Sequence, residues 1–236
     1  MKAIEFSLIL PCYNEAKNLE HLADRLVQVA DLTQGEIVLV NNGSSDNTLN
    51  IIQSLANAHD CIKAVHVEVN KGYGNGIVSG LRAATGNILG YTHADAQTDP
   101  MDAVAGFHQL RARPNQEQVL VKGHRRNRHW FDAIFTVGMG LIESALFQTW
   151  MNDIAAQPTV MHRKMFEKWS TPPKDFSLDL FCYVMGKKHG QVFRFDVDTG
   201  ERYEGISSWN TGILSRLRLI DRTLRYSIRL RCWGLR

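Results

Sequence analysis

The chain has 236 residues, of which 44% are hydrophobic, 22% charged and 9% aromatic. This composition is typical of a globular protein and excludes an intrinsically disordered chain. Lysine and arginine number 27 against 24 for aspartate and glutamate, which gives a formal net charge of +3. So small an excess does not indicate nucleic-acid binding, and the basic residues are not interleaved with an aromatic platform for bases. We expect no nucleic-acid partner.

The cysteines lie far apart and form no CxxC pair: Cys12, Cys61, Cys182 and Cys232. This spacing favours a reduced protein over a disulfide framework or a zinc site. The apolar run at residues 6–10 is too short for a signal peptide, and the run at 135–147 is shorter than the ~20 residues of a spanning helix. We therefore expect a cytoplasmic protein.

In the first half of the chain, strand-like apolar runs alternate with helical patterns. The strand-like runs are residues 4–10, 36–40, 61–69, 88–92 and 119–122. Helical spacing of apolar residues predicts helices at 14–30, after a cap at Ser44 or Ser45, around 77–84 and after Pro100. This alternation predicts an α/β fold with a mostly parallel sheet that is covered on both faces.

The pattern changes at about residue 123. A long helix is expected at 132–150, a polar turn at 152–157, a strand at 159–162, a helix at 175–188 and a strand at 191–196. We interpret residues 1–122 as a half of nucleotide-binding type and residues 123–209 as a half of the same compact domain that completes the site. Residues 210–236 are predicted to form a basic amphipathic C-terminal helix, with arginines on one stripe and leucine and isoleucine on another.

Polar and glycine residues follow four consecutive predicted strands. These stretches are residues 11–15, 41–46, 70–74 and 93–97. Ligands bind outside the carboxyl ends of the strands in an open α/β sheet, so four such ends should converge on one crevice. Turn residues would be expected there in any case, but four stretches in register favour a nucleotide site over ordinary turns.

These stretches also carry a family resemblance. The strings PCYNE at 11–15, NGSSDNT at 42–48, KGYG at 71–74 and DAQ at 95–97 resemble the motifs of family-2 inverting glycosyltransferases with the GT-A fold. The resemblance is nearest to polyprenyl-phosphate and dolichyl-phosphate sugar transferases, and it continues through KGHR, DIAAQP, and ER followed by GISSW. It implies a Rossmann-like three-layer α/β/α fold, a nucleotide-sugar donor and a divalent metal. It also implies that residues 1–122 are the nucleotide-sugar-binding half and residues 123–209 the acceptor-binding half of the domain.

On this resemblance, the first two loops bind the nucleotide. Tyr13 can stack on a base, Glu15 can accept hydrogen bonds from ribose or base, and Pro11 fixes the turn that presents them. Glu15 could instead be a first-turn acid that the helix dipole favours. At Asn42 the family usually has Asp, and because an amide is both donor and acceptor the identity of the base stays open.

The third loop carries Lys71 and a run of glycines. Lys71 is the better candidate for ligand contact, whereas the glycines serve either a flexible turn or close approach to a ligand. The run is a poor match to a dinucleotide fingerprint, which argues against an NAD-dependent oxidoreductase.

The fourth loop is the expected metal site. Transfer from a nucleoside diphosphate must stabilise the departing diphosphate, and Mg²⁺ or Mn²⁺ takes hard oxygen ligands such as the Asp95 carboxylate and the Gln97 carbonyl. His93 stands where relatives have a first Asp, which changes the donor contact at that position and would shift the metal preference towards Mn²⁺.

Several later residues complete the expected site. Arg125, in a basic cluster with Lys122, Arg126 and Arg128, is the candidate for diphosphate or acceptor-phosphate binding, and Arg126 is assigned to solvent. Arg202 and Ser207 resemble a loop that closes over the diphosphate.

Asp153, in the polar turn with Gln157, would be the general base for a sugar hydroxyl acceptor, or a positioning group for a lipid phosphate, which is already anionic. Asp179 is a second candidate, although helix acids are usually surface charge.

The C-terminal basic helix has two interpretations. It can lie on an anionic membrane surface, which would place the protein peripherally on the inner face of the membrane, or it can pack against the domain with its arginines in solvent.

The sequence as a whole predicts an inverting glycosyltransferase with catalytic residues Asp95, Asp153 and Arg125 and a polyprenyl phosphate as acceptor. The alternatives are a glycan or small-molecule acceptor, and a catalytically impaired protein that binds nucleotide sugars or lipid phosphates.

Overall fold

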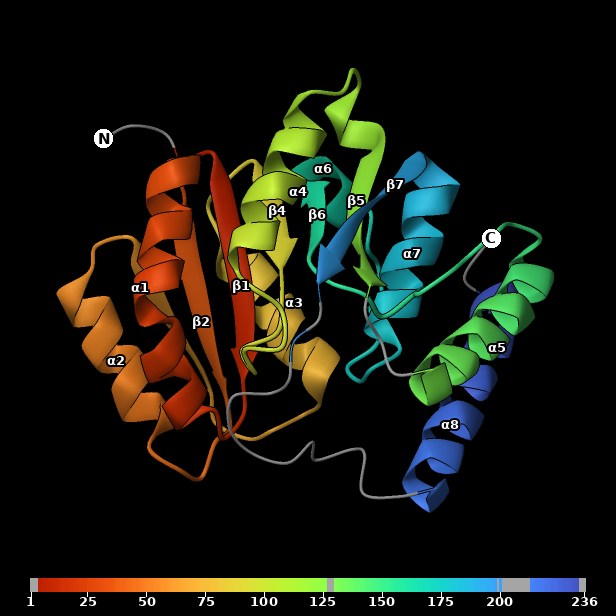
Figure 1. The fold of residues 1–236 in the computed structure, drawn as a ribbon, viewed down its shortest axis with the longest axis horizontal. Helices are drawn as coiled ribbons and strands as arrows, with labels where there is room; N and C mark the ends of the chain where they lie inside the picture. Colours follow the sequence, from red (N-terminus) through yellow and green to blue (C-terminus); the bar gives the residue numbers. More distant parts are fainter. Residues whose placement is uncertain (1–3, 127–129, 199, 201–212, 234–236) are drawn as a thin grey trace.

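A computed structural model describes residues 4–126, 130–198, 200 and 213–233. Its centre is a seven-stranded sheet with the order β3-β2-β1-β4-β6-β5-β7 (Figure 1). The strands are β1 (Phe6–Cys12), β2 (Glu36–Asn42), β3 (Ile62–Val67), β4 (Ile88–Tyr91), β5 (Val119–Arg126), β6 (Thr159–His162) and β7 (Gln191–Asp198). Every pair in the sheet is parallel except the two that involve β6. The expected mostly parallel sheet is confirmed.

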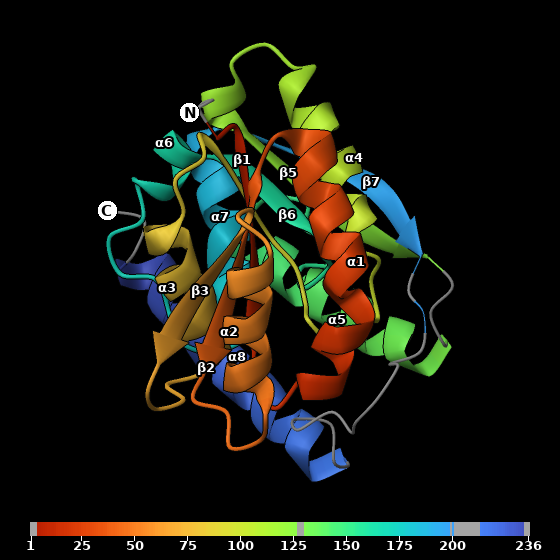
Figure 2. The same cartoon turned by 90° about the vertical axis from the view of Figure 1, so that its left-hand side faces the viewer.

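Helices cover both faces of this sheet, which gives three layers (Figures 1 and 2). One face carries α1 (Ala16–Thr33), α2 (Thr48–Ala58) and α4 (Met101–Arg111), and the other carries α3 (Tyr73–Ala83), α6 (Arg163–Phe166) and α7 (Leu178–His189). Side chains alternate between the layers along each strand: Leu8 and Leu10 pack with α1, whereas Ile9 packs with α3. Because both faces are buried, the central strands are apolar over most of their length.

The antiparallel strand β6 decides where the later polar turn lies. Its first residue, Thr159, pairs with Tyr91 at the end of β4 and with Lys122 of β5. The chain therefore enters β6 at the edge where β1, β2, β4 and β5 end. The turn at residues 152–158 is thereby placed beside the loops that follow the parallel strands.

The expected elements are present with small shifts at their ends, and one expectation needs correction. The predicted cap of α2 is wrong: Ser44 and Ser45 lie in the preceding loop, and Asp46 Oδ1 accepts the Thr48 backbone N–H at 3.0 Å instead. The short helix α6 and a 3₁₀ turn (Gln116–Gln118) were not predicted, because they carry too few residues for a periodic signal. The two proposed halves of the domain meet within β5.

The helices α5 (Trp130–Phe147) and α8 (Ile213–Trp233) lie side by side at one end of the sheet (Figure 1). Ser227 Oγ of α8 donates to the buried Glu143 Oε1 of α5 at 2.6 Å, and Arg231 Nε donates to the Leu146 carbonyl at 3.1 Å. Leu230 joins the core beneath α7. The C-terminal helix thus packs against the domain. Among the described residues, no helix has both the length and the apolar character to cross a bilayer.

Candidate active site

The loops after β1 and β2 are held together by hydrogen bonds. The Asn14 backbone N–H donates to Ser44 Oγ at 3.1 Å, and Asn14 Oδ1 accepts the Ser45 N–H at 2.8 Å. The Glu15 N–H donates to Thr48 Oγ1 at 2.9 Å. The residues expected to bind a nucleotide therefore belong to one connected surface. Serine and threonine side chains act here as links between loops.

Left-handed backbone conformations recur in these loops. Asn14 (φ 57°), Ala96 (φ 59°) and Asp153 (φ 42°) each lie in a loop at the carboxyl edge of the sheet. Residues other than glycine adopt the left-handed conformation only at a cost in free energy, and residues that do so cluster at functional sites. The three positions therefore support this edge as the site.

Tyr13 and Glu15 lie at the end of β1. Tyr13 is 41% exposed, so its ring is available for stacking on a planar ligand. The Glu15 side chain accepts a hydrogen bond from Asn18 Nδ2 in the first turn of α1. Its carboxylate therefore has a structural partner as well as a position at the site, and Pro11 precedes both in β1.

Asn42 is buried at the end of β2. Its Nδ2 donates to the Gly72 carbonyl at 3.1 Å and lies 3.4 Å from Asn70 Oδ1, while its own Oδ1 is buried and has no hydrogen-bond partner among the described residues. The amide group is thus used as a donor to the third loop. The remaining polar atom is an acceptor, the same function that an aspartate would offer.

The glycines of the third loop pack against protein backbone. A Cβ on Gly72 (φ 108°) would lie 2.4 Å from the Lys174 carbonyl oxygen, and one on Gly74 would lie 2.4 Å from the Pro173 oxygen. These positions let the segment before α7 cross the start of α3, where the Asn75 N–H donates to the Lys174 carbonyl at 2.9 Å. These glycines therefore allow the close approach of another segment of the chain, the one before α7. Lys71 is exposed beside them.

The fourth loop forms a tight turn at Asp95. The Asp95 carboxylate is buried, and its Oδ1 accepts the Gln97 backbone N–H at 3.2 Å. The Gln97 carbonyl accepts the N–H of Gly200, just after β7, at 2.9 Å. Asp95 and Gln97 are thus brought together by one turn. Over the described residues, no group of three or more His, Cys, Asp or Glu side chains could hold a metal ion, so a cation here would need further oxygen ligands from a substrate or water.

Asp153 and Arg125 are paired with each other. Arg125 Nε donates to Asp153 Oδ1 at 3.0 Å, Nη2 contacts the same oxygen, and the Arg125 backbone N–H donates to Oδ2 at 2.8 Å. Arg194 of β7 braces the turn, because its guanidinium donates to the carbonyls of Gly123 (2.6 Å) and Asp153 (3.1 Å). The two candidates come together as a bidentate ion pair at the end of β5.

Two charged residues singled out in the sequence lie in the interior. Lys122, which the sequence groups with Arg125, Arg126 and Arg128, is fully buried in β5, where its Nζ donates to Thr159 Oγ1 at 2.6 Å. Asp179, the second candidate on the acceptor side, is buried in the first turn of α7 and accepts a hydrogen bond from the Tyr91 hydroxyl at 3.0 Å, so it is not a surface charge. Both side chains are buried because β5 has a neighbouring strand on each side and α7 packs on the sheet.

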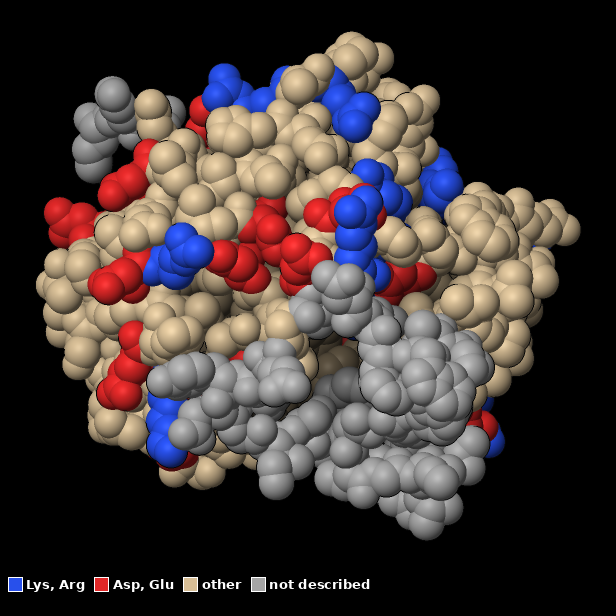
Figure 3. Space-filling model, in the orientation of Figure 1, with Lys and Arg blue, Asp and Glu red and all other residues tan. Residues whose placement is uncertain are grey.

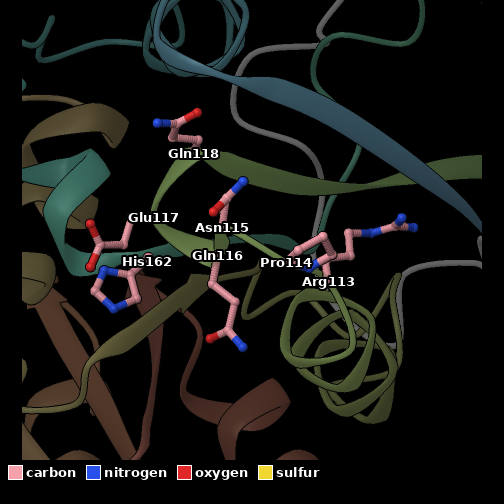
Figure 4. A pocket seen from close by; sticks show the side chains of 7 residues that line it. All are labelled: Arg113, Pro114, Asn115, Gln116, Glu117, Gln118 and His162. Carbon is pink, nitrogen blue, oxygen red and sulfur yellow. The ribbon is translucent and has the colours of Figure 1, made fainter.

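Other expected site residues fall in different places. Arg126 is exposed and pairs with Asp196, which agrees with its assignment to solvent. Arg128, Arg202 and Ser207 lie outside the described residues. A shallow polar depression lined by residues 113–118 and His162 (Figure 4) lies at the opposite edge of the sheet, where β5 begins and β6 ends. It contains none of the predicted site residues.

With this geometry in place, the family model for glycosyl transferase family 2 matches residues 7–170. The chain belongs to glycosyl transferase family 2. The family resemblance inferred from the loop motifs is confirmed. The match spans β1 to α6, and therefore includes the Asp95 turn and the Arg125–Asp153 pair.

Curated relatives of this family 2 chain are similar over different lengths. A protein of Synechocystis sp. described as an uncharacterized glycosyltransferase is 28% identical over 88% of the chain. The undecaprenyl-phosphate 4-deoxy-4-formamido-L-arabinose transferase of Proteus mirabilis is 29% identical over 55% of it. The chain spans 65% and 40% of the lengths of these two proteins.

Solved structures confirm the expected fold for this family 2 chain. The glucosyl-3-phosphoglycerate synthase of Mycobacterium tuberculosis, in complex with Mn²⁺, uridine diphosphate and glucosyl-3-phosphoglycerate, has a TM-score of 0.73 at 16% identity. The superposition covers 97% of this chain and 80% of that one. A complex of the same synthase with Mg²⁺ and uridine diphosphate has a TM-score of 0.71.

Sequence reasoning about this family 2 member missed three contributors to the site: Tyr73, Phe176 and Arg194. The Tyr73 ring stacks against both His93 and Phe176, and Arg194 braces the Asp153 turn. Arg194 interrupts an apolar run between Phe193 and Phe195, which is a usable signal for an arginine that is partly buried. Nothing local marks Phe176, because its contact with Tyr73 depends on how α7 packs.

Proposed function

We propose that this chain transfers a sugar from a nucleotide-sugar donor to a polyprenyl phosphate with inversion at the anomeric carbon. The observation that carries the proposal is the placement of the Asp95–Gln97 turn and the Arg125–Asp153 pair at one edge of the sheet. Because β6 pairs with both β4 and β5, a donor group at the end of β4 and an acceptor at the end of β5 would lie beside each other. Proximity of this kind supplies much of the acceleration in group transfer.

The donor side fits a nucleoside diphosphate with a divalent cation. Asp95 and Gln97 offer hard oxygen ligands, and Mg²⁺ is commonly held by one or two carboxylates together with substrate phosphates and water. A bound Mg²⁺ or Mn²⁺ would neutralise charge on the diphosphate. Tyr13 supplies an exposed ring for the base, and Asn42 Oδ1 supplies a hydrogen-bond acceptor. The M. tuberculosis synthase was crystallised with the same combination, uridine diphosphate with Mn²⁺ or Mg²⁺.

The acceptor side favours an oxygen that is already anionic. Asp153 is buried and its two carboxylate oxygens take hydrogen bonds from Arg125, which leaves it poorly suited to removing a proton from a sugar hydroxyl. A phosphate oxygen needs no such base. That oxygen forms the bond to the anomeric carbon while the bond to the diphosphate oxygen breaks, and the diphosphate leaves with the electron pair. Arg125, positioned by Asp153, provides positive charge beside the attacking phosphate.

A lipid acceptor would require contact with a membrane, and α5 and α8 supply a suitable surface. Val137 and Leu141 are exposed one turn apart on α5, and Ile228 is exposed on α8. The neighbouring Arg222 and Arg225 are half-exposed or more. Exposed apolar side chains beside arginines are typical of helices at anionic bilayer surfaces. We therefore propose peripheral association through this pair.

Vesicle flotation tests the membrane part of the proposal. Leu141→Glu should reduce binding of the chain to vesicles that contain an anionic phospholipid, because it places a negative charge at the proposed contact. Leu32→Glu is the matched control, since Leu32 is equally exposed but lies on α1. Equal flotation of the two variants and the wild type would refute the surface.

A transfer assay tests the activity. Wild-type protein, Asp95→Asn and the control Asp99→Asn are supplied with UDP-sugars or GDP-sugars, Mn²⁺ and a short polyprenyl phosphate. Asp99 belongs to the same loop but pairs with Arg25, and asparagine keeps its bond to the Met101 N–H. We expect transfer by the wild type and the control, and at least a 100-fold loss in Asp95→Asn. Equal transfer to a neutral sugar would contradict the phosphate acceptor.

A second candidate, a binding protein without turnover, is favoured by His93 in place of the acid that relatives carry. It predicts that a nucleoside diphosphate with Mn²⁺ raises the melting temperature of the protein while no acceptor is glycosylated.

A further inference from the structure

Tyr73 lies at the centre of an aromatic stack that joins three parts of the site. Its ring centroid is 5.7 Å from that of His93, with planes at 29°, and 4.9 Å from that of Phe176, with planes at 16°. His93 belongs to the loop after β4, and Phe176 to the segment before α7. The Tyr73 ring thus has two aromatic neighbours from different segments of the chain.

The close packing that builds this stack is fixed by backbone. Tyr73 follows Gly72, and the absence of a side chain there lets the Lys174 carbonyl approach the start of α3. Phe176 is thereby held against the Tyr73 ring. His93, two residues before Asp95, stacks against the same ring.

The Tyr73 hydroxyl connects the stack to the acceptor side. It accepts a hydrogen bond from Gln157 Nε2, in the turn that also holds Asp153. Asp179 is its second partner, and burial together with this carboxylate raises the pKa of Tyr73 well above its ordinary value. The phenol therefore keeps its proton across the physiological range. Asp179 also accepts from Tyr91, so a buried polar network runs beneath the site.

We propose that Tyr73 is a positioning residue that holds the acceptor-side turn, through Gln157, in register with the donor-side loop, through His93. This proposal rests on the proposed function, because it concerns the alignment of the two substrates of that reaction. The residue makes no contact with reacting atoms in this role. Misalignment by about 1 Å is enough to cost on the order of 100-fold in rate.

Two substitutions distinguish the role of the Tyr73 ring from the role of its hydroxyl. Tyr73→Phe keeps both stacks and removes the partner of Gln157, whereas Tyr73→Leu removes the stacks as well. We expect Tyr73→Phe to bind UDP or GDP with Mn²⁺ within about 2-fold of wild type while kcat for transfer falls about 10-fold or more. Tyr73→Leu should lose nucleotide affinity in addition. Tyr183→Phe, which removes the hydroxyl of another buried tyrosine on α7, should leave both quantities unchanged.

A spectroscopic readout checks the geometry without turnover. The imidazole signals of His93 in a histidine-labelled protein, assigned by their loss in His93→Gln, should carry a ring-current shift from Tyr73. The shift should persist in Tyr73→Phe and disappear in Tyr73→Leu. A shift that survives in both variants would overturn the stacking role.

The outcomes separate this inference from the proposed function. A wild-type chain that neither binds a nucleoside diphosphate nor transfers a sugar refutes the function, and the positioning role falls with it. An active wild type whose Tyr73→Phe variant has unchanged kcat refutes the positioning role alone. A Tyr73→Phe variant that loses nucleotide affinity and kcat in equal proportion, with a lowered melting temperature, also refutes it, because that result indicates a structural role.

Discussion

Lys122 and Asp179 are both buried, and Lys122 Nζ lies 4.0 Å from Asp179 Oδ1 between the sheet and α7. Burial lowers the pKa of Lys122, while the carboxylate of Asp179 opposes that shift. The pair is completed by Thr159, which accepts from the amine, and by Tyr91, which donates to the carboxylate. Each charge thus depends on the other in a site that solvent does not reach.

Removing one charge of this pair should be costly. Lys122→Met leaves a buried carboxylate without its counter-charge, and we expect a loss of about 3–5 kcal/mol in the free energy of unfolding. Adding Asp179→Asn to that variant should restore part of the loss, because the asparagine oxygen still accepts from Tyr91. Urea unfolding of both single variants and the double variant measures the coupling. Strictly additive losses would contradict it, and Lys164→Met, at the exposed pair with Glu117, is the control.

Two glycines should respond to alanine in opposite directions. Gly72→Ala places a Cβ 2.4 Å from the Lys174 oxygen in a left-handed conformation, so we expect about 1–3 kcal/mol of destabilisation and loss of the contact with α3. Gly138 on α5 has no atom within 4 Å of such a Cβ, and Gly138→Ala should gain about 0.5–1 kcal/mol from helix propensity. Unfolding midpoints compare the two. A neutral Gly72→Ala would show that the 173–175 segment can move away.

Asp102 should make stability depend on pH. Burial, with Asp99 and Asp198 nearby, raises the pKa of Asp102 to about 6. Figure 3 shows other acidic side chains gathered across the middle of one face of the molecule. Because its pKa is raised, the Asp102 carboxyl holds its proton more tightly in the folded state than in the unfolded state. The contribution of Asp102 to stability therefore becomes destabilising as pH rises from about 4 through 6.

The variant Asp102→Asn removes that dependence. Relative to wild type it should gain stability between pH 4 and 7, by on the order of 1 kcal/mol once solvent screening of this half-exposed group is discounted. Urea unfolding at several pH values measures the difference. Asp60→Asn, at an exposed aspartate, is the matched control for the loss of one carboxylate. A flat difference for Asp102→Asn would contradict the raised pKa.

The Arg125–Asp153 pair predicts how activity depends on pH. If Asp153 positions Arg125, Asp153→Asn should lower kcat/KM for a phosphate acceptor about 10- to 100-fold while the shape of the pH profile is kept. If Asp153 were a general base, the variant would lose the acidic limb of the profile. Asp196→Asn, at the exposed pair with Arg126, is the control and should retain activity.

Sequence patterns predicted the strands and helices well because both faces of the sheet are buried. Strands such as β2 are apolar over most of their length, and the helices α1 and α2 have apolar residues on one face, so the period of each element is visible locally. The strand β6 was predicted with its observed bounds. Its antiparallel direction was not predicted, because direction depends on pairing with distant residues of β4 and β5.

The candidate site likewise has one part that the sequence predicted and another that depends on tertiary packing. The sequence by itself determined which loops carry polar residues. It made Asp95, Gln97 and Arg125 candidates after predicted strands, and Asp153 a candidate in the polar turn after the predicted long helix. Only the tertiary structure decided that Arg125 and Asp153 pair with each other, that Lys122 and Asp179 are buried, and that Tyr73 contacts both the loop after β4 and the turn before β6. A side chain's type and the period of its element are local properties. Its partner is set by the packing of segments far apart in the chain, and charge pairing and desolvation depend on that partner.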